Sequence, residues 1–255
     1  MRVVIKVGTS TLAHATGRLN IRRTGELCRF ISDLKNAGNE VILVSSGAIG
    51  MGVGKLGLKE KPKDIHTKQA AAAIGQCELM DTYDRLFTEY DHVVAQILLT
   101  GSDFQAEDRH TNFNNTLSRL LTLNVLPIIN ENDTIATEEI KVGDNDTLSA
   151  LVAVSAKADI LIILSDVDGL YSADPHKNPD ATLIKTLQGV PENILEMAGD
   201  EGSALGTGGM KTKLRAAKIC TDNGCDMVIA NGEHPEQLYD IVAEKEGNYT
   251  RFFKQ

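Results

Sequence analysis

The chain has 255 residues and a hydrophobic content of 42%, enough to bury the core of a large α/β domain, which excludes a disordered or fibrous protein. Its formal net charge of −9 argues against a general role on nucleic acid or on an anionic membrane, because both attract a broad positive field. A few well-placed lysines would therefore have to receive any anionic substrate.

The cysteines and the apolar runs narrow the class of protein further. The apolar run at the N-terminus is too short for a signal peptide, and no later run in the sequence is long enough to span a bilayer. We therefore expect a cytoplasmic protein that binds neither nucleic acid nor membrane. The cysteines lack the spacing and the nearby histidines of a zinc site, so we expect free thiols at Cys28, Cys77, Cys220 and Cys225.

Short runs rich in β-branched residues recur along the chain, and most of the segments between them have helical patterns. This alternation predicts a mainly parallel sheet covered by helices. The runs cover residues 3–7, 41–44, 93–98, 125–129, 160–164 and 227–230.

The first helix between these strands has the clearest pattern. Leu27, Phe30, Ile31 and Leu34 follow the i, i+3, i+4, i+7 spacing of a helix with one apolar face. Gly38 supplies a C-terminal stop. We expect the apolar stripe to face the sheet.

Two segments interrupt the alternation. The pattern shortens over residues 134–142, which predicts a hairpin, and two Asx-Pro pairs predict turns and loops between residues 170 and 187. We find no internal repeat and no flexible linker in the sequence. We therefore expect a single domain, 1–255, with only a soft division near residue 150.

Glycines, hydroxyls and carboxylates follow four of the predicted strands, at the sheet edge where parallel sheets bind ligands. One such loop would be ordinary turn chemistry, but four at matching ends predict a shared polar site. Glycines there let backbone N–H groups approach phosphate, although each glycine could instead serve only its strand-to-helix turn. The sequence contains no Walker A motif. The four segments are 8–10, 45–50, 130–133 and 165–166.

Lys6 interrupts an otherwise apolar strand, where an unpaired ammonium would be costly to bury. It therefore needs an anionic partner at the end of the strand. The alternative is a lysine on an edge strand whose ammonium group reaches solvent.

A glycine-rich stretch at residues 206–210 runs into a helical pattern that carries Lys211 and Lys213 near its start. Cations are disfavoured at a helix N-terminus, so two lysines there predict a bound anion, with phosphate the obvious candidate. The alternative is a solvent-exposed loop whose lysines are incidental.

The densest polar cluster is Asp144-Asn145-Asp146, directly before another helical run. A helix start needs one capping residue of this kind, so three in succession exceed that need, although pure capping remains the alternative. A carboxylate here could orient a lysine or help to hold a magnesium-bound phosphate, because Mg²⁺ takes hard oxygen ligands.

In their order and spacing, these segments resemble the amino-acid kinase family, and within it the members that phosphorylate glutamate. The resemblance covers essentially the whole chain. It implies a three-layer αβα sandwich with a mainly parallel central sheet. The matching segments are 5–10, 45–49, 130–133, 143–146, 165–171 and 206–210.

The resemblance implies phosphorylation of the side-chain carboxylate of L-glutamate, the first step of proline biosynthesis. ATP would be the co-substrate, with Mg²⁺ as cofactor. By motif, Lys6 and Lys213 match the two lysines that stabilise the moving phosphoryl group, and Asp146 matches the carboxylate that organises them. Asp144 matches a supporting catalytic residue. No residue is assigned as a direct metal ligand.

The remaining matches divide between two mainly separate lobes. Residues 1–150 would mainly bind glutamate, through Ser46, Asn130, Asp133 and Asn145. Residues 151–255 would mainly bind ATP. The residues matched to the ATP site are Lys6, Gly8, Ser165, Asp166, Thr207, Gly208, Gly209, Met210, Lys211, Thr212 and Lys213.

Two departures from the family pattern are visible. Lys211 stands where the family favours a small polar residue, which puts the nucleotide contacts of this loop in doubt. The sequence also ends at Gln255 without the C-terminal PUA domain of many glutamate-phosphorylating members, so we expect the short, kinase-only form. The resemblance further suggests a homo-oligomer and feedback inhibition by proline.

Several rival functions share these motifs. Other members of the family phosphorylate acetylglutamate, aspartate, carbamate or UMP, and a nucleotide-binding sensor could keep the fold without turnover. The expected acceptor site is rich in Asp and Asn and not in arginine, which disfavours UMP. The presence of Lys6, Asp146 and Lys213 together disfavours a sensor.

Overall fold

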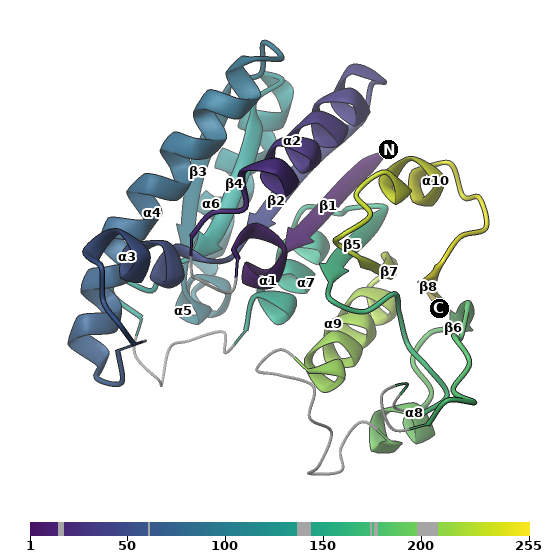
Figure 1. Cartoon of the computed structure of the whole chain (residues 1–255). Helices are drawn as coiled ribbons and strands as arrows, with labels where there is room; N and C mark the ends of the chain where they lie inside the picture. The colour runs from purple at the N-terminus through teal and green to yellow at the C-terminus, as the bar shows by residue number, and fades with distance from the viewer. Residues whose placement is uncertain (15–17, 61, 137–143, 174, 176–177, 198–208) are drawn as a thin grey trace.

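The computed structural model describes residues 1–255 except 15–17, 61, 137–143, 174, 176–177 and 198–208. Within these described ranges, the strands form one eight-stranded sheet in the order β3-β4-β2-β1-β5-β7-β8-β6 (Figure 1). The β7–β8 pair is antiparallel and the other pairs are parallel. The strands are β1 (Arg2–Val7), β2 (Glu40–Ser45), β3 (Val94–Leu99), β4 (Leu126–Glu131), β5 (Ile160–Ser165), β6 (Thr186–Gln188), β7 (Asp226–Asn231) and β8 (Tyr249–Phe253).

The helices lie on both faces of this sheet. Val4 of β1 packs in one buried cluster with residues of α6, α7 and α9, whereas its neighbours Val3 and Ile5 pack with α2, α4 and α10. The predicted three-layer αβα sandwich with a mainly parallel sheet is confirmed. The helices are α1 (Thr9–Leu12), α2 (Ile21–Asn36), α3 (Ala48–Leu56), α4 (Ile65–Thr88), α5 (Gly101–Gln105), α6 (Glu107–Thr122), α7 (Asn145–Ser155), α8 (Glu192–Met197), α9 (Met210–Asp222) and α10 (Gln237–Val242).

The six strands expected from the sequence are all present, each ending within two residues of its predicted bounds. The short strands β6 and β8 were not predicted. In β8, Thr250 and Arg251 are buried, so the strand lacks the apolar pattern of the others. Burial of Arg251 is possible because its Nη2 atom lies 2.8 Å from Oδ2 of Asp226 on β7.

The helix predicted from Leu27, Phe30, Ile31 and Leu34 is α2, and all four side chains are buried against the sheet. Gly38 lies just beyond its end with φ of 90°, a conformation that favours glycine. Both expectations are confirmed.

The hairpin expected over residues 134–142 lies mostly outside the described residues. Its first residues belong to a turn after β4, in which the N–H groups of Ile135 and Ala136 donate to the carbonyl oxygen of Asn132. The turn expected at Asn178-Pro179 is present, and the Asn178 side chain accepts a hydrogen bond from the backbone N–H of Asp180.

The backbones of helices α3 and α4 are in direct contact at two glycines. A Cβ atom on Gly52 of α3 would overlap the carbonyl oxygen of Ala71, and a Cβ atom on Gly75 of α4 would overlap that of Ala48. Any side chain at either glycine would therefore push the helices apart. This contact fixes α4 against the start of α3, directly after β2.

Candidate active site

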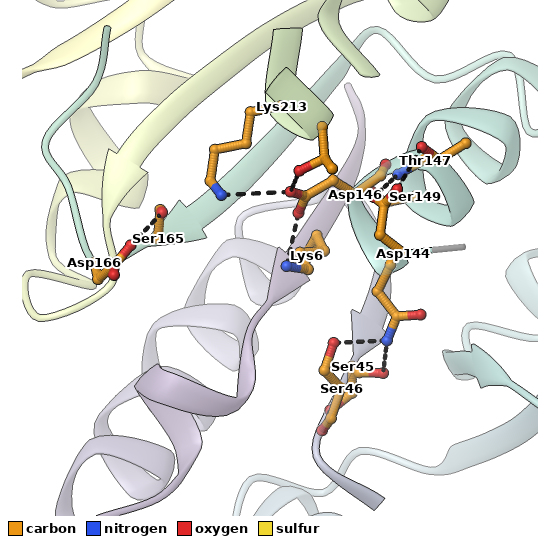
Figure 2. Close-up of polar contacts among 12 residues, drawn as sticks. Lys6, Ser45, Ser46, Asp144, Asp146, Thr147, Ser149, Ser165, Asp166 and Lys213 are labelled. Atoms are coloured by element: carbon orange, nitrogen blue, oxygen red, sulfur yellow. Dashed lines mark hydrogen bonds and ion pairs between the residues drawn. The ribbon is translucent and has the colours of Figure 1, made fainter. Parts of the chain in front are cut away.

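Asp146 lies between two lysines that come from different elements. Its Oδ1 atom is 2.7 Å from Nζ of Lys6, and its Oδ2 atom is 3.4 Å from Nζ of Lys213. Asp146 is only 1% exposed, and the two lysines are 9% and 7% exposed. Figure 2 shows the two ammonium groups approaching the carboxylate from β1 and from α9. We call Lys6, Asp146 and Lys213 the lysine–aspartate cluster.

The fold explains why these three residues meet. Side chains alternate along a strand, so Lys6 points to the same face of the sheet as Val4, the face that α7 and α9 cover. Asp146 lies in the first turn of α7, and Lys213 lies in the first turn of α9. The alternative of an edge lysine does not hold, because β1 lies between β2 and β5.

The electrostatics of the cluster keep the carboxylate charged. Burial alone would raise the pKa of Asp146, but the charges of Lys6 and Lys213 and the hydrogen bonds from Lys6 and Thr212 outweigh this effect. The pKa therefore lies below its ordinary value. Asp146 is an anion throughout the neutral range and can hold both ammonium groups.

Thr212 adds a hydroxyl to the same carboxylate. Its Oγ1 atom lies 2.8 Å from Oδ2 of Asp146 and 2.9 Å from the carbonyl oxygen of Gly209, the residue that precedes α9. Thr212 was assigned to the ATP site by motif. In the structure it also ties the start of α9 to Asp146.

The three polar residues at the start of α7 have three different partners. Asp144 caps the helix, because its Oδ1 accepts from Thr147 N at 2.8 Å and its Oδ2 accepts from Thr147 Oγ1 at 3.0 Å. Asp146 joins the lysine–aspartate cluster. Asn145 turns instead toward β2 and β4. Pure capping therefore explains only the first of the three, and a catalytic role for Asp144 stays a prediction.

Asn145 connects two residues expected to bind glutamate. Its Nδ2 atom lies 2.6 Å from Oγ of Ser46 and 3.1 Å from Oδ1 of Asn130, and it also approaches the carbonyl oxygen of Ser45. Asn130 is buried at the end of β4. Figure 2 shows Ser46 at the end of β2 facing the start of α7. We call Ser46, Asn130 and Asn145 the acceptor cluster.

Asp133, the fourth residue expected to bind glutamate, lies in the turn after β4 and is half-buried. It follows Asn130 by three residues, so it belongs to the same end of the sheet. Its predicted role stays a prediction.

No motif in the sequence indicated Gln76, which contacts the acceptor cluster from α4. Its Oε1 atom accepts a hydrogen bond of 3.0 Å from Nδ2 of Asn130. A glutamine in a long helix normally faces solvent. The spacing of apolar residues along α4 cannot show that neighbouring elements bury Gln76. In the structure, Gln76 lies against β3 and β4, where it bonds Gln96 and Asn130.

The residues expected at the ATP site lie on the α9 side of the lysine–aspartate cluster. Ser165 ends β5, and its Oγ donates to Oδ1 of the exposed Asp166 at 3.0 Å. A Cβ atom on Gly8 would lie 3.5 Å from Nζ of Lys6, so this loop passes close to the ammonium group.

Among the described residues, no side chain caps the start of α9, and no acidic residue lies in its first turn. Backbone N–H groups at such a helix N-terminus can receive an anion. Gly209 precedes the helix, Met210 packs partly against the core, and Lys211 is exposed. Thr207 and Gly208 lie outside the described residues.

Two further features can be stated for the described part of the chain. No helix there is both long and apolar enough to cross a membrane. Nor do the described residues contain a group of three or more His, Cys, Asp or Glu side chains placed to hold a metal ion.

Comparison with known sequences gives matches over nearly the whole chain. The model of the amino acid kinase family matches residues 1–231. A glutamate 5-kinase from Clostridium acetobutylicum is 56% identical over 247 residues, which are 96% of this chain and 92% of that protein. A glutamate 5-kinase from Caldanaerobacter subterraneus is 53% identical over 95% of this chain, which spans 65% of that longer protein.

Solved structures share the fold at much lower identity. A carbamate kinase from Giardia lamblia bound to AMP-PNP superposes with a TM-score of 0.70 at 18% identity, covering all of this chain and 98% of that one. An isopentenyl phosphate kinase from T. acidophilum in a product complex gives 0.69 at 19% identity, covering 99% of this chain and all of that one.

Proposed function

The chain belongs to the amino acid kinase family, and we propose that it transfers the terminal phosphoryl group of ATP to the side-chain carboxylate of L-glutamate. The product is L-glutamyl 5-phosphate, and the reaction is the first step of proline biosynthesis. Identity above 50% to several glutamate 5-kinases over at least 94% of the chain supports this acceptor over the other family substrates. The family expected from the sequence is confirmed.

The observation that carries the proposal is the adjacency of the two clusters. Asn145 belongs to the acceptor cluster, and Asp146, the next residue, belongs to the lysine–aspartate cluster. A glutamate whose amino-acid end is bound at the first would extend its side-chain carboxylate toward the ammonium groups of the second. This is the arrangement that phosphoryl transfer to a carboxylate requires, because it depends on alignment and charge neutralisation.

The nucleophile needs no general base. The side-chain carboxylate of glutamate is already ionised at neutral pH, so no proton has to be removed from it. One of its oxygens attacks the terminal phosphorus of ATP, and the bond from that phosphorus to ADP breaks. Lys6 and Lys213 stabilise the charge on the transferring group, while Asp146 holds both ammonium groups in position.

The hydrogen bonds of the acceptor cluster suggest how it holds the amino-acid end of glutamate. Oδ1 of Asn130 already accepts from Nδ2 of Asn145 and from the backbone N–H of Glu131. Asn130 therefore offers its second N–H, which suits the α-carboxylate of the substrate. Oδ1 of Asn145 has no hydrogen-bond partner among the described residues, so with Asp133 it suits the α-ammonium group.

The nucleotide is proposed to lie on the side of α9. Its phosphates would meet the N-terminal N–H groups of α9, with Gly209 and Lys211 beside them. Thr207 and Gly208 are assigned to this site by motif alone. Ser165 and Asp166 at the end of β5 would contact the remainder of the nucleotide. This assignment keeps the division in which residues 1–150 mainly bind glutamate and 151–255 mainly bind ATP.

The residues present fit a Mg²⁺ ion held mainly by the phosphates of ATP. The carboxylate of Asp146 is occupied by two lysines, and the described residues offer no cluster of three ligands. Asp144 could contribute a remaining oxygen lone pair, directly or through water. When bound, the ion neutralises charge on the phosphates.

On the family resemblance alone, we also propose that the protein is a cytoplasmic homo-oligomer and that proline inhibits it.

A substrate panel tests the proposed function. ADP release should be strongest with glutamate, weak with N-acetylglutamate, and at background with aspartate, UMP or no acceptor. Added hydroxylamine should trap the acyl phosphate as a hydroxamate, which identifies the carboxylate as the acceptor. Equal ADP release without any acceptor, or turnover of another member of the panel in place of glutamate, would contradict the proposal.

A further inference from the structure

We propose that Gln76 is a positioning residue for the acceptor site, because it fixes the side-chain amide of Asn130 in the orientation that presents an N–H to the substrate. This inference rests on the proposed function. Gln76 matches none of the motifs in the sequence. It is 8% exposed, and its Oε1 atom accepts from Nδ2 of Asn130 at 3.0 Å.

The orientation of the Asn130 amide is set from both ends. The backbone N–H of Glu131 is an obligatory donor and lies 2.9 Å from Oδ1 of Asn130, so the oxygen must face it. Nδ2 of Asn145 donates to the same oxygen at 3.1 Å. The nitrogen of Asn130 then faces Gln76, which accepts one of its two N–H groups and leaves the other for a ligand.

The orientation of Gln76 is in turn supported by Gln96 of β3. Nε2 of Gln76 donates to Oε1 of Gln96 at 3.1 Å, which leaves Oε1 of Gln76 to accept from Asn130. Gln96 is exposed and can reorient, so it is the weaker anchor. Hydrogen bonds between side-chain amides therefore connect Gln96 on the edge strand β3, through Gln76 and Asn130, to Asn145 of the acceptor cluster.

The backbone of α4 holds Gln76 in this place. Its neighbour Gly75 lies against the carbonyl oxygen of Ala48 with no room for a side chain, so α4 cannot slide along α3. Asn130 is 2% exposed, so an N–H that loses its acceptor there has no water to replace it. Without Gln76, this N–H would lose its acceptor, and the Asn130 amide would shift from the position in which its second N–H faces the substrate.

The test is the kinetics of Gln76→Met, which keeps the length of the side chain and removes the acceptor. We expect the KM for glutamate to rise about five- to hundredfold, the range that corresponds to leaving one buried donor unpaired. The KM for ATP should change less than about twofold, because Gln76 contacts only the acceptor side. Gln96→Met is the matched control and should have a much smaller effect, because Gln76 still accepts from Asn130.

A double-mutant cycle separates positioning from a general loss of structure. In an Asn130→Ala background, Gln76→Met should add little to the rise in the KM for glutamate, because the group it positions is absent. Additive effects, an unchanged KM for glutamate, or equal losses of kcat/KM for glutamate and ATP would overturn the inference. Gln76→Ala, which introduces no new contact, replaces Gln76→Met if the latter does not fold. A parent enzyme that does not use glutamate would instead contradict the proposed function.

Discussion

Nζ of Lys6 lies 2.7 Å from Oδ1 of Asp146, although more than half of the chain separates the two residues. The pair is formed because Lys6 is on the inner strand β1 and Asp146 is in the first turn of the helix that covers this strand. Lys213 reaches the other oxygen of the same carboxylate. One buried anion thus holds two cations that would otherwise repel each other.

The two lysines should be essential for the chemical step and dispensable for the fold. Lys6→Ala and Lys213→Ala should each lower kcat about 10²–10³-fold, the cost of removing one donor from a developing charge. Steady-state kinetics and circular dichroism check the two parts of this prediction. Lys218→Ala is the control, because Lys218 lies on the same helix as Lys213 but pairs with Asp222 at the surface. Near-normal turnover by a folded lysine variant would exclude that lysine from the mechanism.

Asp146 should stabilise the fold in a way that depends on pH. Its pKa in the folded protein lies below the ordinary value of 3.8, so its charge stabilises the fold at pH values above that value. The contribution is lost as the pH falls through the range below 3.8. We expect Asp146→Asn to be less stable than the parent at neutral pH, with the difference narrowing as the pH approaches that range. Urea unfolding of both proteins over the pH series measures this difference in the free energy of unfolding. A difference that does not change with pH would show that the charge of Asp146 is not its source.

Thr212 should contribute to catalysis through its hydroxyl group and not through the shape of its side chain. Thr212→Val keeps the branched side chain but removes the hydrogen bond to Asp146, so kcat should fall about tenfold for a loss of about 1.4 kcal/mol. Thr212→Ser restores the hydroxyl and should recover most of the activity. If the valine and serine variants lose activity equally, packing of the Thr212 methyl group is the important feature.

Variants of Asp144 can distinguish a role in capping helix α7 from a role in catalysis. Its two oxygens bind the N–H and the hydroxyl of Thr147, which is the geometry of a helix cap. Serine caps helices about as well as aspartate, so Asp144→Ser should keep the stability while Asp144→Ala loses about 1 kcal/mol. A serine variant with parental stability but much lower kcat would support the predicted catalytic role. Parental kcat in the same variant would restrict Asp144 to the cap.

The sequence predicted the parts of the site that are marked by local patterns. Lys6 stood out because it is charged within an apolar strand, and Asp144 to Asp146 stood out because three capping residues exceed what a helix needs. The separate partners of these three could not be predicted, because they depend on the direction that each side chain takes in the first turn of α7.

Other features depend on contacts between distant segments. Gln76 is buried where α4 packs against β3 and β4, a contact that no periodicity within α4 reveals. Arg251 is buried in β8 because Asp226 of β7 neutralises it, so the sequence of this strand is not apolar. Patterns of hydrophobicity fail to predict burial at such residues, because a partner from a distant segment satisfies the polar side chain.

The last prediction concerns the choice between glutamate and its N-acetylated relative. Free glutamate carries an ammonium group that the carboxylate of Asp133 can pair with, whereas an acetylated nitrogen has no charge. Losing this charge-assisted contact to the substrate costs roughly 1–3 kcal/mol, which corresponds to about five- to hundredfold discrimination. Acetylglutamate should therefore be a poor substrate of the parent enzyme.

Asp133→Asn tests this explanation more sharply than a change to alanine. Asparagine fits turns as well as aspartate does, so the turn after β4 is kept and only the charge is removed. We expect the KM for glutamate to rise about tenfold or more, the KM for ATP to stay nearly constant, and the preference for glutamate over acetylglutamate to narrow. If Asp133 serves only the turn, the asparagine variant will match the parent in all three measurements, whereas Asp133→Ala will lose stability.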